Sequence, residues 1–217
     1  NLEQEGTGID VSLVRETHQV EPNLDLLHDL IFQVGRTLKN TGFFIFWCDL
    51  DQWDLLSVWA TESGLRYQRW PIVWVKTDPC MNSQAYKNFT KSTEIAMLCA
   101  KPKAQLTISR SQNYWIGSND KKLYSVTNPF WKPVQMHKWI LNAIARPGET
   151  IVDPFAGCGS IPLACVQNGY HIIAIEKDEV KAALLARRRP SWAVYEGDCV
   201  AALRAGFSVL AEPGSAK

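Results

Sequence analysis

The segment from residue 150 to residue 160, Thr-Ile-Val-Asp-Pro-Phe-Ala-Gly-Cys-Gly-Ser, constrains the fold of this chain more than any other. An apolar run predicts a strand that ends at Asp153, and two glycines predict a tight turn before a helix that begins near Ser160. Gly157 and Gly159 carry no Cβ, so the backbone can approach a ligand closely there. The free N–H groups at the start of the helix face the same space. In α/β proteins this arrangement predicts a site for a nucleotide-like cofactor.

Acidic residues follow the next two predicted strands. Residues 171–175 form a second apolar run, which ends at Glu176. An acidic residue about 20 positions after a glycine turn can accept hydrogen bonds from ribose hydroxyls; a solvated charge at a strand end is the alternative. A third short strand, residues 192–195, leads to Asp198. Asp198 is predicted to reach a cofactor base from the same edge of the sheet, and a turn-forming aspartate is the alternative.

Composition limits the class of protein. The chain has 217 residues, 46% of them hydrophobic, and a formal net charge of +1, which suits one α/β domain with a substantial core. A net charge near zero predicts that any surface for nucleic acid is local. No apolar run is long enough to span a bilayer, and there is no signal-peptide pattern. Six scattered cysteines without a Cys-x-x-Cys pair predict reduced thiols, no metal site and a cytoplasmic location.

Hydrophobic periodicity predicts helices and strands in alternation, which favours a doubly wound, mostly parallel sheet. The expected helices begin at Pro22, at Asp51, at residue 132 and after Asp178, and further strands are expected over residues 43–47, 70–76 and 94–100. Residues 101–130 break this pattern, because polar and basic residues are mixed there with Tyr114, Trp115 and Tyr124. We interpret them as an insertion on the rim of the sheet that suits phosphates and unstacked bases, with an ordinary solvated loop as the alternative.

The order of these motifs resembles one family. The glycine turn comes late in the chain, whereas it opens most Rossmann-like folds. Lys132-Pro133 stands about 20 residues before the turn. This permuted order is similar to that of amino-group DNA methyltransferases of the β arrangement, in particular phage- and prophage-type modification methylases. Asp153 to Ser160 resembles the family's S-adenosylmethionine motif, Lys132-Pro133 its motif X, and Glu176 its ribose-binding acid.

The resemblance implies a Rossmann-like α/β methyltransferase fold with a circularly permuted motif order, in a single domain over residues 1–217. It divides this domain into a catalytic half (1–100), a rim insertion (101–130) that could read DNA, an S-adenosylmethionine-binding half (131–205) and a tail (206–217). The cofactor-binding residues that it implies are Lys132, Pro133, Asp153, Pro154, Phe155, Ala156, Gly157, Gly159, Ser160, Glu176 and Asp198.

The resemblance also implies the reaction. A methyl group passes from S-adenosylmethionine to an exocyclic amine of a flipped base in double-stranded DNA. The acceptor expected first is N6 of adenine, and N4 of cytosine comes second. The catalytic motif of the family, Asp-Pro-Pro-Tyr or a variant, does not occur in the chain. Its nearest approximations are Asp78-Pro79-Cys80-Met81 and Asn128-Pro129-Phe130-Trp131. We therefore expect the motif and its strand upstream of Asn1, which would leave the edges of two neighbouring strands open.

Other interpretations stay open from the sequence. A non-catalytic or degenerate module would bind DNA or a partner, and a homodimer or partner chain could supply the absent strand. An RNA or protein methyltransferase, or a nucleotide oxidoreductase, would use a similar glycine turn.

Overall fold

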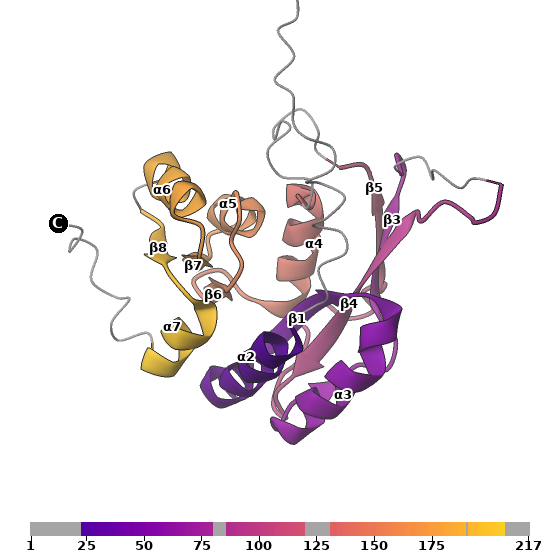
Figure 1. The fold of residues 1–217 in the computed structure, drawn as a ribbon, viewed down its shortest axis with the longest axis horizontal. Helices are drawn as coiled ribbons and strands as arrows, with labels where there is room; N and C mark the ends of the chain where they lie inside the picture. Colours follow the sequence, from indigo (N-terminus) through magenta and orange to yellow (C-terminus); the bar gives the residue numbers. More distant parts are fainter. Residues whose placement is uncertain (1–22, 80–85, 120–130, 190, 207–217) are drawn as a thin grey trace, which may run out of the picture.

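The computed structural model describes residues 23–79, 86–119, 131–189 and 191–206, which form two sheets and the helices around them (Figure 1). The larger sheet contains β1 (Phe43–Cys48), β2 (Arg66–Tyr67), β3 (Ile72–Lys76), β4 (Thr93–Ala100) and β5 (Tyr114–Gly117). The smaller sheet contains β6 (Thr150–Asp153), β7 (His171–Glu176) and β8 (Ala193–Glu196). The helical elements are α2 (Leu24–Thr37), η1 (Leu50–Gln52), α3 (Trp53–Glu62), α4 (Val134–Ile144), α5 (Ser160–Gln167), α6 (Glu179–Arg188) and α7 (Cys199–Ala205).

Side-chain caps explain where several helices begin. Asn23, Asp178 and Asp198 precede α2, α6 and α7, and each side chain accepts a hydrogen bond from a backbone N–H in the first turn. Such caps satisfy amides that have no partner within the helix. Asp178 caps its helix as the sequence predicts, whereas α2 begins one residue after Asn23 rather than at Pro22, which lies outside the described residues.

The sheets differ in the direction of their strands. In the smaller sheet the order is β6-β7-β8 and all pairs are parallel. In the larger sheet the order is β1-β4-β3-β5; β4 runs antiparallel to β1, β2 and β3, and β3 pairs with β5 in parallel. The fold is α/β with mostly co-directional strands, and β4 is the strand that runs in reverse.

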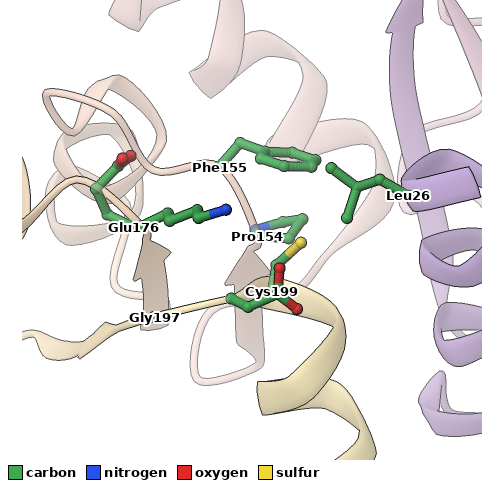
Figure 2. Close-up of a pocket in the computed structure, with 8 residues that line it drawn as sticks. Leu26, Pro154, Phe155, Glu176, Gly197 and Cys199 are labelled. Atoms are coloured by element: carbon green, nitrogen blue, oxygen red, sulfur yellow. The ribbon is translucent and has the colours of Figure 1, made fainter. Parts of the chain in front are cut away.

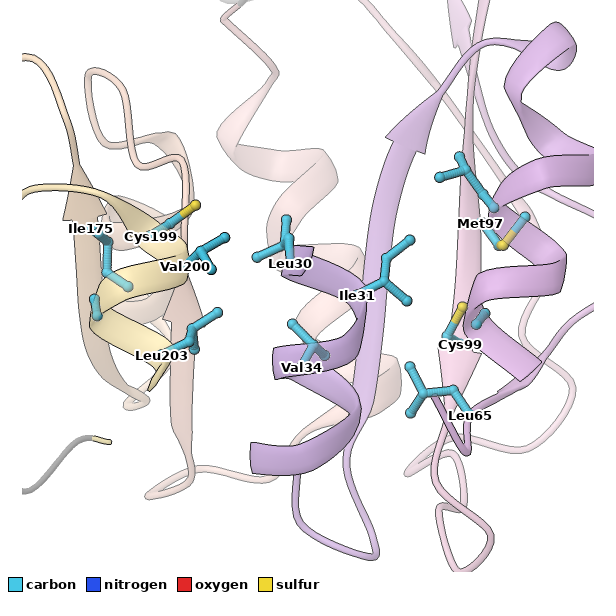
Figure 3. Close-up of a cluster of buried hydrophobic side chains, with 13 residues drawn as sticks. Leu30, Ile31, Val34, Leu65, Met97, Cys99, Ile175, Cys199, Val200 and Leu203 are labelled. Carbon is cyan, nitrogen blue, oxygen red and sulfur yellow. The ribbon is translucent and has the colours of Figure 1, made fainter. Parts of the chain in front are cut away.

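The two sheets do not join through strand pairing. Among the described residues, β6 pairs only with β7 and β1 pairs only with β4, so each strand keeps one open edge. Figure 3 shows β1 and the strands of the smaller sheet running in the same direction, with α2 between them. The open edges therefore belong to strands that could both pair in parallel with one further strand.

Helices α2 and α4 hold the two sheets together (Figures 1 and 3). Leu30, Ile31 and Val34 of α2 are buried in one cluster with Ile175 of β7 and Met97 of β4. Helix α4 does the same through two clusters. Val134, Leu141 and Ala145 pack with the smaller sheet, and Met136 and Ile140 pack with Ile72 and Trp74 of the larger sheet.

Two features of the fold differ from the sequence-based expectation. Residues 114–117 lie in the segment predicted as a rim insertion, yet they form β5, because Tyr-Trp-Ile is a β-favouring run even within a polar stretch. Residues 120–130 lie outside the described part. The polar surroundings of Trp131 in the sequence do not indicate a core residue, but it is 5% exposed and packs beside α4 and α5. Within the described ranges, no helix is both long and apolar enough to cross a membrane.

Candidate functional site

A pocket of about 80 Å³ opens where β6, β7 and β8 end (Figure 2). Parallel strands place their carboxyl ends at one edge of the sheet, which is where α/β proteins bind ligands. The pocket is lined by Leu26, Pro154, Phe155, Glu176, Lys177, Gly197, Asp198 and Cys199. In Figure 2, Phe155 and Leu26 face each other above Pro154 and Cys199, and Glu176 lies at the far side. The pocket thus combines an apolar surface with three charged side chains, those of Glu176, Lys177 and Asp198.

Backbone amides of the glycine turn hold the carboxylate of Glu176 in place. The Gly157 N–H donates to Glu176 Oε2 at 2.6 Å, and the Asp178 N–H donates to Oε1 at 3.0 Å. The Ala156 N–H also donates to the carbonyl of Ile175 at 3.0 Å. Hydrogen bonds to a charged acceptor are the stronger kind, so the turn and the end of β7 form one rigid unit.

Gly159 is required for the packing around the glycine turn. It is the N-cap of α5 with φ +92°, a conformation that disfavours other residues. A Cβ at this position would lie 2.6 Å from Leu185 Cδ2 and 3.3 Å from the ring of Trp192, and both side chains are buried. The structure thus shows that Gly159 makes room for α6 and the segment before β8, and its role in the approach of a ligand stays a prediction.

Asp153 is buried behind the pocket, with 5% of its surface exposed. Burial, with a smaller contribution from the charge of Glu176, raises the pKa of its carboxyl from 3.8 to about 7. The hydrogen bond from the Phe155 N–H to Asp153 Oδ1, at 3.2 Å, acts in the opposite direction. This carboxyl group can therefore change its protonation state near neutral pH.

The structure brings together most of the residues predicted from the sequence. Pro154, Phe155, Glu176 and Asp198 line the pocket, and Asp153, Ala156, Gly157, Gly159 and Ser160 form the strand end, turn and helix start behind it. Lys132 and Pro133 do not line the pocket. Pro133 is fully buried, and Lys132 Nζ lies 3.1 Å from Glu94 Oε2 beside the larger sheet.

Asp198 caps a helix and also lines the pocket. Its Oδ1 accepts a hydrogen bond from the Ala201 N–H at 2.9 Å and so caps α7. The same residue contributes to the lining of the pocket. The cap fixes Asp198 at the pocket, and its contact with a cofactor base stays a prediction.

Sequence reasoning missed Leu26, Lys177, Gly197 and Cys199. Lys177, Gly197 and Cys199 adjoin predicted residues, so the strand ends could have indicated them. Leu26 comes from α2, more than a hundred positions earlier, and no local pattern marks it. Its backbone N–H donates to Asn23 Oδ1 at 3.0 Å, so the helix cap helps to fix this wall of the pocket.

The two approximations to the catalytic motif lie largely outside the described residues, which exclude Cys80, Met81 and residues 128–130. Asp78 is described, and its Oδ1 accepts a hydrogen bond from the Asn119 N–H at 3.2 Å, so this carboxylate links two loops. In the described part of the chain, no cluster of three His, Cys, Asp or Glu side chains could hold a metal ion.

Fold and pocket together define a Rossmann-like α/β protein whose glycine turn and ligand pocket come late in the chain. A model of the N6/N4 DNA methylase family matches residues 11–187, and the chain belongs to this family. A relative, the type II methyltransferase M2.DpnII of Streptococcus pneumoniae, is 30% identical over 54% of this chain and 49% of its own length. The chain thus spans about half the length of this curated relative.

Solved structures support the same fold. The complex of M1.HpyAVI with S-adenosylmethionine has a TM-score of 0.68 and 22% identity, over 77% of this chain and 83% of that chain. The cytosine-N4-specific PvuII DNA methyltransferase has a TM-score of 0.57 and 15% identity, over 69% of this chain and 64% of that chain. The third structure is TTHA0409, a DNA modification methylase of Thermus thermophilus, in complex with S-adenosyl-L-methionine. It has a TM-score of 0.55 and 18% identity, over 76% of this chain and 75% of that chain. The fold class predicted from the sequence is confirmed.

The packing role of Gly159 predicts the effect of Gly159→Ala. Gly148 offers a matched control, because it also has a positive φ, +86°, but a Cβ added there would meet no atom within 4 Å. We expect Gly148→Ala to cost about 1 kcal/mol from backbone strain, and Gly159→Ala a further 1 to 3 kcal/mol or so from overlap with Leu185 and Trp192. Urea unfolding of the three proteins measures both costs. Equal destabilisation by the two variants would contradict the packing role.

The raised pKa of Asp153 predicts a pH-dependent stability. The pKa of this carboxyl is about 7 in the folded state and 3.8 when unperturbed. Its contribution to the free energy of unfolding is therefore fully present below about pH 4 and is lost as the pH rises through about 7. Relative to Asp153→Asn, the wild type should lose on the order of 2 to 4 kcal/mol of unfolding free energy between about pH 5 and pH 8. Urea unfolding at a series of pH values measures this difference. Parallel pH curves for the two proteins would refute it.

Proposed function

We propose that the chain binds S-adenosylmethionine in the pocket at the ends of β6, β7 and β8, as part of a DNA amino-methyltransferase. The observation that carries the proposal is the Glu176 carboxylate, held by the N–H groups of Gly157 and Asp178 at the edge of the pocket. A fixed acceptor at the end of the second strand suits the two ribose hydroxyls of a nucleoside. Phe155, Leu26 and Cys199 supply an apolar surface for its base.

The polar groups of the turn favour this cofactor over a dinucleotide. Dinucleotide sites direct free N–H groups of the glycine turn at a pyrophosphate. Here four N–H groups of the turn, those of Phe155, Ala156, Gly157 and Gly159, donate to acceptors within the protein, so fewer remain for a pyrophosphate. In the pocket lining the carboxyl groups of Glu176 and Asp198 outnumber the ammonium group of Lys177, which favours a cation. S-adenosylmethionine fits both conditions, because it has no phosphate and supplies an activated methyl group on a positively charged sulfur.

The open edges of β6 and β1 suggest where the catalytic residues belong. Both strands could pair in parallel with one strand between them, and α2 and α4 already cover the two faces of that position. We infer that this position, the slot between β6 and β1, receives the strand that carries the family's Asp-Pro-Pro-Tyr-type motif. Such a strand would end beside the pocket, at the edge where Pro154 and Phe155 follow β6.

The proposed substrate is an exocyclic amine of a base in double-stranded DNA, N6 of adenine or N4 of cytosine. This amine is a weak nucleophile, because its lone pair is delocalised into the ring. The motif's polar side chain and a backbone carbonyl would accept the hydrogens of the amine, and its aromatic residue would stack on the flipped base. A segment of a longer polypeptide or a partner chain could supply this strand, and a DNA substrate fits the predicted cytoplasmic location.

Calorimetry with S-adenosylmethionine tests the cofactor site. Glu176→Gln should weaken binding by about tenfold or more, because a half-buried charged acceptor is lost. Leu26→Ala should weaken it about five- to tenfold through lost apolar contact. Glu196→Gln is the matched control, since Glu196 pairs with Glu176 in the strand register but is exposed and does not line the pocket. Preferential binding of NAD, or equal effects of the two Glu variants, would overturn the assignment.

Transfer of a labelled methyl group to duplex DNA tests whether the slot between β6 and β1 receives the catalytic strand. The chain alone should bind S-adenosylmethionine yet transfer little, whereas a longer polypeptide that includes a catalytic-motif strand should methylate DNA. Limited proteolysis would then show protection of the new strand. Full activity of the chain alone would refute the slot, and methylation of RNA instead of DNA would refute the proposed substrate.

A further inference from the structure

Two lysines share one glutamate beside the larger sheet. Lys76 is the last residue of β3, Glu94 lies near the start of β4, and Lys132 lies two residues before α4. Lys76 Nζ is 2.6 Å from Glu94 Oε1, and Lys132 Nζ is 3.1 Å from Oε2. The side chains of the two lysines are only 23% and 20% exposed. This lysine–glutamate cluster therefore concentrates charge in a largely shielded place.

Aromatic rings keep both ammonium groups in this position. Lys76 Nζ lies 4.9 Å from the ring centroid of Trp74, and Lys132 Nζ lies 5.2 Å from that of Trp47. Each cation is thus attracted by a ring face as well as by the carboxylate. The lysines are pre-positioned, and a ligand that contacts them would lose less side-chain entropy on binding than with free surface lysines.

The cluster carries one excess positive charge. Burial alone would raise the pKa of Glu94, but the charges of Lys132 and Lys76 outweigh it and hold the pKa below its usual value. The glutamate is therefore ionised at neutral pH and balances only one of the two lysines. The first turn of α4 adds no negative charge, because it contains no acidic residue and its N-cap, Pro133, provides no side-chain cap. An anion is the complement that this arrangement lacks.

The cluster lies at the same edge of the molecule as the pocket. It is formed where β1 and β3 end and β4 begins, and β1 runs in the same direction as the strands of the smaller sheet (Figure 3). The pocket lies where those strands end. A polyanion that presents one of its bases at this edge would pass beside Lys76 and Lys132.

We propose that Lys76 and Lys132, held by the rings of Trp74 and Trp47, together bind a phosphodiester group of the nucleic acid, and that Glu94 offsets part of their positive charge. The proposal rests on the proposed function and gives Lys132 a substrate-binding role in place of the cofactor-binding role predicted from the sequence. It also predicts that Glu94 opposes binding, since its carboxylate repels the phosphate. If the cluster were only a structural tie without a phosphate contact, removing the charge of Glu94 would leave the affinity of the folded protein for DNA unchanged.

The sign of the effect of Glu94→Gln therefore tests the proposal. Affinity of the full chain for a short fluorescent DNA duplex is measured by anisotropy over a series of salt concentrations. Glu94→Gln should tighten binding by about threefold or more, while Lys76→Gln should weaken it and reduce the slope of log K against log salt by about one. Lys76→Arg keeps the charge and should keep the slope. Thermal unfolding of each variant confirms that it is folded.

Arg204→Gln is the matched control, because it also removes one positive charge from an ion pair, that with Asp29, in the last turn of α7. It should leave both affinity and slope unchanged. Unchanged or weaker binding by folded Glu94→Gln, or an unchanged slope for Lys76→Gln, would overturn the phosphate contact while leaving the proposed function intact. Absence of DNA binding by the wild type at every salt concentration would overturn both.

Discussion

Burial of apolar side chains on α2 and α4 is the constraint on which the rest of this structure depends. The two sheets share no strand pairing within the described residues, so no backbone hydrogen bond sets their relative position. Helix α2 packs against both sheets through Leu30 and Val34. Helix α4 packs against the larger sheet through Met136 and against the smaller sheet through Leu141. Apolar burial is non-directional, and it tolerates an open position between the sheets as long as the helices remain packed. This explains how the pocket keeps its shape while β6 and β1 retain open edges.

The roles of the residues in the glycine turn follow from which of their groups already have partners within the protein. The Gly157 N–H is engaged by Glu176, and Gly159 is occupied by its contacts with Leu185 and Trp192. What remains for a ligand is the pocket lining, with the charged side chains of Glu176, Lys177 and Asp198 and the apolar surface around Phe155.

The sequence was sufficient where the structure is local. A strand end, a glycine turn and an acid at the next strand end depend on neighbouring residues, and Asp153, Gly157 and Glu176 lie where the pattern predicts. It was insufficient where partners are distant. Leu26 lines the pocket from α2, and Lys132 pairs with Glu94 instead of lining the pocket. Local hydrophobic periodicity predicts neither contact, because the partners are far apart in the sequence. Strand β5 was missed because its four residues are too few to show a period within a polar segment.

A chain with 23 basic and 22 acidic residues cannot attract a polyanion through its net charge. Selectivity must come from the placement of charge, and the two ends of this edge differ in sign. Glu176 and Asp198 outnumber Lys177 at the ends of the smaller sheet, where the proposed sulfonium would be stabilised. Lys76 and Lys132 outnumber Glu94 at the larger sheet, where the proposed phosphate would be stabilised. On the proposed function, a cationic methyl donor and an anionic acceptor strand would therefore bind at two neighbouring places on the same edge of the molecule, each beside charge of the opposite sign.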